Sequence, residues 1–384
     1  MHRRTLLAAS AAAAAAPLIR PARAQTAKTK VVWWHAMTAA LGQEVARLTD
    51  AFNASQTEVE VTQIYKGGYP DVLTATIAAY RAGQAPHIAQ IFEVGTGTML
   101  AAGKAVKQIW ELAQETGVTI DPKAYIASVR GYYSLADGRM GSMPFNSSTA
   151  VMWINRDAFR KAGLDPAKPP ATWQEVVAAA QAIKAKDGTF KYGGRDNAAD
   201  PLLVSGKAGI HFDSSGMRGD LVKNAKFDWA AAFLPYDPDI IKTPLNSNIG
   251  GASLWPMTAP DRTAAEYKGV AQFLVFLSTP ENAAAWHQHT GYVPVTLAGF
   301  ELSKQQGFYA KNPGADLPVL QLTRGTVTDN SRGLRLGRLP EIRNIIQEEL
   351  EKALQGGQTA QQAMDNSVTR GNHVLREFQK SVKA

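Results

Sequence analysis

The chain contains no cysteine among its 384 residues. Without thiols it can form no disulfide framework, thiolate zinc site, iron–sulfur cluster or cysteine nucleophile. Charged residues make up only 19% of the chain and aromatic residues 8%, which is ordinary for a globular protein and argues against a disordered chain or a coiled coil. The length suits two domains, or one large one, with a sizeable core.

Long apolar runs are also missing. The one marked apolar stretch lies in residues 1–24, behind a basic start, and ends in the small-residue sequence Ala22-x-Ala24. It is too short to span a membrane, and this pattern is typical of an export signal. Arg3-Arg4 fits a twin-arginine signal or an ordinary secretion signal equally well. We therefore expect an exported, periplasmic protein, and the lack of cysteine after the cleavage site excludes a lipoprotein anchor.

The charge balance changes once this signal is removed. The whole chain carries 41 basic and 33 acidic residues, a net charge of +8. Residues 1–24 hold four arginines and no acid, so the remaining chain has 37 basic and 33 acidic residues, or +4. Nucleic-acid binding loses most of its support with this correction, and we expect no nucleic-acid partner.

Strand and helix patterns alternate along the first half of the chain. Residues 30–34, 59–65 and 87–92 read as strands, and Leu41 opens a helical apolar stripe between the first two. This alternation predicts an α/β sheet with crossover helices. Further strands are expected at 150–154 and 249–255, and further helices follow Asn155, Thr172, Tyr267 and Glu341, with a final amphipathic helix through Ala363, Val368, Val374, Leu375 and Phe378. Residues 187–226 show no clear strand–helix unit.

Catalytic and metal-binding motifs are weak. Gly95-Thr-Gly97 lacks the third glycine of a dinucleotide loop, and the segment from Gly97 to Lys104 has five residues where a P-loop needs four. His287 and His289 are two apart on an expected helix and face different directions, so none of the seven histidines forms a ligand pattern and we expect no metal site. Nothing positive supports an enzyme.

A cluster of arginines offers a binding group instead. Five arginines lie between residues 324 and 343, where most would be solvated and one could face inward to clamp an anion through its planar guanidinium. Hydroxyls of Ser147-Ser148 or Ser214-Ser215 and the backbone of Gly250-Gly251 could assist, although each pair also fits a plain turn or strand kink.

Several longer segments resemble the periplasmic solute-binding proteins of ABC importers, the maltose-binding-protein-like family. Within it, the resemblance is strongest to the group that binds glycerol-3-phosphate or glycerophosphodiesters, and it extends over nearly the whole chain after the signal. The segments that carry it include 34–37, 65–69, 93–96, 144–149, 155–166, 169–173, 250–255, 280–294, 307–316, 333–337 and 340–343.

The resemblance implies a two-lobed α/β fold with hinge crossovers. It places residues 25–143 and 256–310 in the first lobe and residues 144–255 and 311–384 in the second, with hinge strands near 145–154 and 249–255. A ligand captured by lobe closure would be delivered to the membrane subunits of the transporter. No bond would be broken and no cofactor is implied.

The resemblance also implies the site. Two residues of the first lobe, Tyr69 and Glu93, would meet the glycerol hydroxyls, with Glu93 accepting their hydrogen bonds. The phosphate would be surrounded by Ser148, Ser214, the backbone N–H of Gly251, Tyr292 and Arg343. A sugar or polyol ligand and, from another class, a periplasmic phosphodiesterase are the alternatives.

One departure from the family is large. A stretch of several tens of residues normally lies between the helix that ends near Lys186 and the segment that starts at Phe190, and here it is absent. In the family that stretch builds part of the second lobe and carries a tryptophan that packs on the bound glycerol. We therefore expect a truncated second lobe, in which Trp173 does not replace the missing tryptophan.

Overall fold

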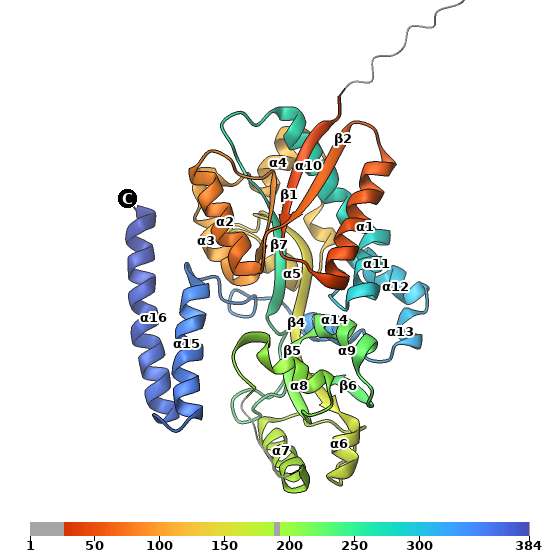
Figure 1. Cartoon of the computed structure of the whole chain (residues 1–384), viewed down its shortest axis with the longest axis vertical. Coiled ribbons are helices and arrows are strands. Elements are labelled where there is room, and N and C mark those ends of the chain that lie inside the picture. Colours follow the sequence, from red (N-terminus) through yellow and green to blue (C-terminus); the bar gives the residue numbers. More distant parts are fainter. Residues whose placement is uncertain (1–26, 188–192, 384) are drawn as a thin grey trace, which may run out of the picture.

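The computed structural model of the chain describes residues 27–187 and 193–383 (Figure 1). The predicted export signal, residues 1–24, lies outside the described residues. So do residues 188–192, where the predicted junction falls. Within the described ranges, no helix is both long and apolar enough to cross a membrane.

The first half of the sheet is built from parallel strands joined by helices. Strand β1 (Thr29–His35) pairs with β2 (Val59–Tyr65) on one side and with β3 (Ile88–Phe92) on the other. Helices α1 (Ala39–Ser55) and α2 (Tyr69–Arg81) connect consecutive strands. The predicted strand–helix alternation is confirmed here, and the carboxyl ends of the parallel strands meet at one edge.

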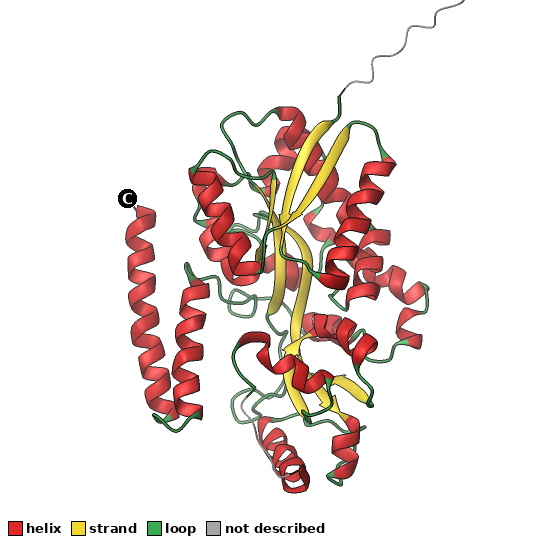
Figure 2. Ribbon diagram, in the orientation of Figure 1, coloured by secondary structure: helices red, strands yellow, loops and turns green. Residues whose placement is uncertain are grey.

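Helices cover both faces of this half (Figure 2). On one face, Val45 and Leu48 of α1 pack with Trp33 of β1 and Phe273 of α10 (Ala264–Leu277), all of them buried. On the other face, residues of α2 join those of β3 in a second cluster. Burying aliphatic and aromatic side chains at both faces is the main force that holds this sheet together.

Two long antiparallel strands carry the sheet into its second half. Strand β4 (Met143–Asn155) pairs with β7 (Ile249–Pro256) through residues 143–149. Its remaining residues pair with β5 (Ile210–Ser214) and β6 (Trp229–Ala232). The strand order is β2-β1-β3-β7-β4-β5, with β6 also on β4, so one sheet continues through both halves. The predicted hinge strands lie where the two halves join.

The second half carries shorter helices. Asn155 caps α6 (Arg156–Lys161), and Thr172 with Glu175 forms the predicted capping box of α7 (Trp173–Asp187). The expectation that no strand–helix unit occurs before Phe227 is wrong. The chain forms α8 (Asp200–Val204), strand β5 and α9 (Arg218–Asn224), which escaped prediction because each is only five to seven residues long and β5 is nowhere fully buried.

The remaining helices are mostly short. Besides brief 3-10 turns they are α3 (Thr96–Leu100), α4 (Ile109–Thr116), α5 (Ala127–Tyr132), α11 (Pro280–Thr290), α12 (Leu297–Gln305), α13 (Phe308–Lys311) and α14 (Leu317–Leu322).

The chain ends in a helical hairpin along one side of the molecule, drawn in blue in Figure 1. Helices α15 (Leu339–Leu354) and α16 (Ala360–Lys383) bury Ile342 and Val374 between them. The prediction that Val368 joins the apolar face of the last helix is wrong, because its side chain is 62% exposed.

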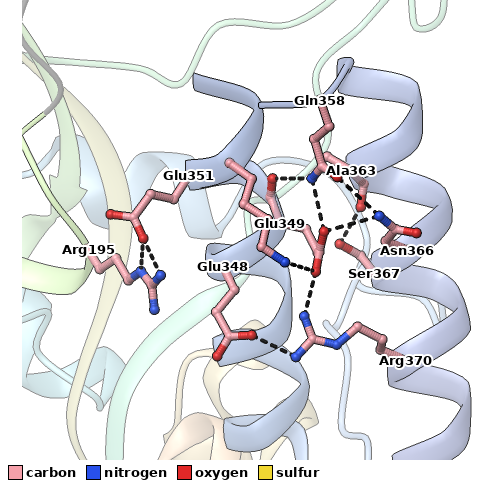
Figure 3. Close-up of polar contacts among 10 residues, drawn as sticks. Arg195, Glu348, Glu349, Glu351, Gln358, Ala363, Asn366, Ser367 and Arg370 are labelled. Carbon is pink, nitrogen blue, oxygen red and sulfur yellow. Dashed lines mark hydrogen bonds and ion pairs between the residues drawn. The ribbon is translucent and has the colours of Figure 1, made fainter. Parts of the chain in front are cut away.

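The turn of the hairpin is organised around one buried carboxylate (Figure 3). Glu349 accepts hydrogen bonds from Lys352 Nζ at 2.8 Å, Gln358 Nε2 at 2.9 Å and Asn366 Nδ2 at 3.2 Å, and Arg370 Nη1 pairs with it at 2.5 Å. A carboxylate with this many donors can be buried at little cost, because its lost hydration is replaced by charge-assisted hydrogen bonds.

Candidate functional site

The edge where the parallel strands end supplies the first two predicted site residues. Tyr69 begins α2 shortly after β2, and its ring stacks on that of Phe92 with centroids 5.6 Å apart. Its hydroxyl accepts a hydrogen bond of 2.7 Å from Asn146 Nδ2 of β4. Burial raises the pKa of Tyr69 well above its usual range, so this hydroxyl stays neutral.

Glu93, directly after β3, lies at the centre of the site. Its side chain is only 18% exposed, and Arg343 Nη1 approaches its Oε1 at 3.7 Å. Burial raises the pKa of Glu93, while the charge of Arg343 and a hydrogen bond donated by the Gly251 N–H oppose that rise. The carboxylate thus already pairs with one of the groups predicted to meet a phosphate.

The backbone conformation at position 251 requires glycine. Its φ of +91° is a conformation that side-chain-bearing residues rarely adopt. A Cβ at this position would also lie 1.9 Å from the carbonyl oxygen of Asn146 on the paired strand β4. Only glycine lets β7 approach β4 closely enough to aim this N–H at Glu93.

The two serines lie on β4 and β5, and Tyr292 follows α11 and packs with the core of the first half. Ser148 is buried in β4, and Ser214, at the end of β5, accepts a hydrogen bond of 3.1 Å from the Gly216 N–H. A Cβ on Gly216 would lie 3.2 Å from Cζ of Tyr292, so this turn packs directly on the tyrosine ring. The hydroxyl of Tyr292 lies close enough to that of Tyr69 for each to shift the other's pKa.

The structure therefore brings the seven predicted residues into one neighbourhood where the two halves of the sheet join. Together they offer three kinds of group: hydroxyls and an N–H that donate, a guanidinium, and one acidic acceptor. Such a set suits a small ligand that carries both an anionic group and hydroxyls. The residues are Tyr69, Glu93, Ser148, Ser214, Gly251, Tyr292 and Arg343.

The other arginines of the predicted cluster point elsewhere. Each has a partner away from Glu93, as expected for residues that are mostly solvated or structural. Arg324 lies over the ring of Phe233, Arg332 pairs with Asp329, Arg335 donates to the carbonyl oxygen of Ser134, and Arg338 pairs with Glu341.

His287 supports the site and was missed as a functional candidate. Its ring is 2% exposed, Nδ1 lies 2.6 Å from the carbonyl oxygen of Tyr292, and Nε2 lies 3.0 Å from the Tyr309 hydroxyl. Burial lowers the pKa of His287 to about 4, so the ring is neutral near pH 7. The sequence showed only a His-x-His pair, of which the second member, His289, instead meets Glu44 at the surface.

A second group of polar side chains was also missed. Donor atoms of Asp200, His211 and Asp213 lie within 4.8 Å of one another, an arrangement that the spacing of the histidines in the sequence did not indicate. His211 and Asp213 are two apart on strand β5 and so share a face, which is the one signal that the sequence could have offered.

Trp173 does not lie free, although it stays half exposed. Its ring meets that of Phe212 with centroids 5.3 Å apart, and the two side chains are 47% and 38% exposed. Trp173 begins α7, and Phe212 lies on strand β5, two residues before Ser214.

Comparison with known proteins identifies relatives. The family profile described as bacterial extracellular solute-binding protein matches residues 34–284. The sn-glycerol-3-phosphate-binding periplasmic protein UgpB of Pectobacterium atrosepticum is 39% identical, over 99% of each chain. The protein of the same name from Escherichia coli K12 is also 39% identical, over 93% of this chain and 95% of its own.

The same alignments bear on the predicted missing segment. The alignment with the Pectobacterium protein has 442 positions, which exceeds the 384 residues of this chain by 58. At least 58 positions of that relative therefore have no counterpart here. The place of the gap, before Phe190, stays a prediction.

Solved structures share the fold. UgpB of Mycobacterium tuberculosis in complex with glycerophosphocholine superposes with a TM-score of 0.77 at 21% identity, over 92% of this chain and all of its own. A cyclic α-maltosyl-1,6-maltose binding protein of Arthrobacter globiformis gives 0.72 at 21% identity, over 91% of this chain and all of its own. The predicted two-lobed α/β fold is confirmed by these likenesses.

Proposed function

Because this chain belongs to the bacterial extracellular solute-binding protein family, we propose that it binds sn-glycerol-3-phosphate or a glycerophosphodiester and delivers it to an ABC transporter. The observation that carries the proposal is the ion pair between Arg343 and Glu93, a carboxylate whose pKa the Gly251 N–H also lowers. The name shared by relatives 39% identical over nearly the whole chain supports the same ligand class.

The chemistry of the site suits the two ends of such a ligand. Arg343 and the Gly251 N–H can donate to phosphate oxygens, with the hydroxyls of Ser148, Ser214 and Tyr292 beside them. Glu93 accepts from the glycerol hydroxyls, and Tyr69 lies next to it. A phosphate removed from water needs several donors of this kind, because an unpaired buried anion is prohibitively costly.

Capture proceeds by closure of the two halves on strands β4 and β7. The site lies where these strands join the halves, so a ligand held by Glu93 on one side and Ser214 on the other favours the closed arrangement. Only binding and release are needed, and no bond in the ligand is broken. Export to the periplasm follows from the predicted signal and from the periplasmic location that the relatives' names give.

The test is Arg343→Ala, followed by titration calorimetry with glycerol-3-phosphate. Removing the guanidinium should weaken binding by roughly 1.5–3 kcal/mol, or about tenfold to a hundredfold, because a charge-assisted contact to the phosphate is lost. Arg332→Ala removes a neighbouring arginine that pairs with Asp329 and should leave affinity unchanged.

Two further assays test the alternatives, a sugar ligand and a phosphodiesterase activity. Maltose should not compete with glycerol-3-phosphate, and incubation with glycerophosphocholine, with and without divalent metal, should release no free choline. Equal affinity in Arg343→Ala and the unaltered protein would remove Arg343 from the site. Binding of maltose alone would replace the phosphate ester by a sugar.

A further inference from the structure

The second half of the sheet carries a compact group of side chains of the types that ligate metal ions. His211 and Asp213 project from the same face of β5, and Asp200 begins the short helix α8. Nε2 of His211 lies 3.2 Å from Asp200 Oδ1 and 4.0 Å from Asp213 Oδ2. All three side chains are partly buried, with 14–25% of their surface exposed.

We propose that Asp200, His211 and Asp213 form a binding site for a divalent transition-metal ion of the zinc class. Zinc bound by one imidazole and two carboxylates at about 2.0–2.2 Å would hold its ligand atoms roughly 3.3 Å apart. The donor atoms already lie within 4.8 Å of one another, so rotation of side chains is enough to complete the site. A water molecule would take the fourth position.

The charge of the group favours a cation. Two carboxylates lie beside one histidine, and burial together with the charge of Asp200 raises the pKa of Asp213. Asp200 and Asp213 each form an ion pair with His211. A divalent ion would neutralise both carboxylates at once. The imidazole favours zinc, nickel or copper over magnesium or calcium, which prefer oxygen ligands.

The ion would cross-link two elements of the second half. Asp200 lies in the segment that follows residues 188–192, whereas His211 and Asp213 belong to β5, so one ion would tie α8 to the sheet. Beneath the cluster lies only a small core that includes Leu203 and Leu221. Metal ligation commonly stabilises parts of proteins whose own core is limited.

Calorimetric titration of the chelator-treated full chain with ZnCl2, without any phosphate ester, tests the site. We expect one zinc ion per chain and a rise in melting temperature with zinc concentration. Magnesium should not compete. His211→Ala and Asp213→Asn should each weaken zinc binding at least about tenfold, since even the loss of an outer-shell partner can cost that much.

His289→Ala is the matched control, because His289 pairs with Glu44 elsewhere and should be irrelevant to the ion. The melting temperature of Asp213→Asn without zinc shows whether this variant is folded. It should equal or exceed that of the unaltered protein, because the substitution removes a poorly solvated charge. Unchanged zinc binding in Asp213→Asn, loss of binding in His289→Ala, or the lack of any zinc binding would each overturn the proposal.

Discussion

At the scale of single residues, the backbone at Gly251 leaves no room for any side chain. Gly251 combines a positive φ with a carbonyl oxygen 1.9 Å from where a Cβ would lie. Gly117 has a similar φ of +68° but nothing within 4 Å of its Cβ position. Comparing alanine substitutions at the two glycines therefore separates the cost of backbone strain from the cost of a steric clash with β4.

Gly251→Ala should lower the free energy of unfolding by about 2–4 kcal/mol, because strain and a clash with β4 add together. Gly117→Ala should cost only about 1–2 kcal/mol, from strain alone. Urea unfolding curves of both variants measure the difference. Equal losses would show that β7 can move away from Asn146 without cost.

His287 predicts a pH dependence of stability. Its pKa is lowered by burial to about 4 in the folded protein, against 6.5 when unfolded. The unfolded chain therefore binds the proton first, so this stability is complete above pH 6.5 and is lost as the pH falls toward 4. The loss should reach up to about 3 kcal/mol.

The measurement is urea unfolding between pH 7 and pH 4 for the unaltered protein and His287→Gln. The variant should be less stable at pH 7 and should show a shallower decline with falling pH. His289→Ala, whose ring is more than half exposed, should keep the full decline. An identical decline in His287→Gln would assign the effect to other groups.

At the scale of elements, the hairpin of α15 and α16 is held at its turn by Glu349 (Figure 3). Hydrogen bonds from Lys352 and Gln358, followed by Arg370 and Asn366, lower the pKa of Glu349 to about 2. Since the folded pKa lies below the usual 4.5, this contribution is complete above pH 4.5 and is lost as the pH falls toward 2.

Glu349→Gln should loosen the hairpin at pH 7, because a neutral amide cannot accept from all four donors. Hydrogen exchange followed by mass spectrometry should show at least about tenfold faster exchange in peptides from residues 339–383, with strands β1 to β3 unchanged. Glu377→Gln, which removes only a surface pair with Lys380, is the control. Equal protection in Glu349→Gln would make the network dispensable.

At the scale of the whole molecule, the proposed capture of a ligand depends on two halves that share one sheet through β4 and β7. If ligand capture closes these halves, small-angle scattering should show a smaller radius of gyration when glycerol-3-phosphate is added. Arg343→Ala should require a correspondingly higher ligand concentration for the same change. A radius that stays constant while calorimetry shows binding would mean that the halves are already closed without ligand.

The long, regular elements could be predicted from the sequence because their local signals agree with their packing. Strand β1 and helix α1 show apolar periodicity that matches their buried faces, and Thr172 with Glu175 marks the start of α7. Helix α8 could not be predicted, because a single helical turn gains its stability from neighbours rather than from local propensity. Strand β5 has no fully buried residue, so it lacks the apolar run that marks the equally short β3.

For the site, the sequence alone determined which groups were available: no thiol, an arginine-rich segment, and polar residues after β2 and β3. Only the tertiary structure decided that Arg343, among five arginines, faces Glu93, and that His211 meets Asp200 and Asp213. The physical reason is that sequence patterns report on a few neighbouring residues. These contacts instead join segments far apart in the sequence, which come together when the sheet is buried and β4 pairs with β7.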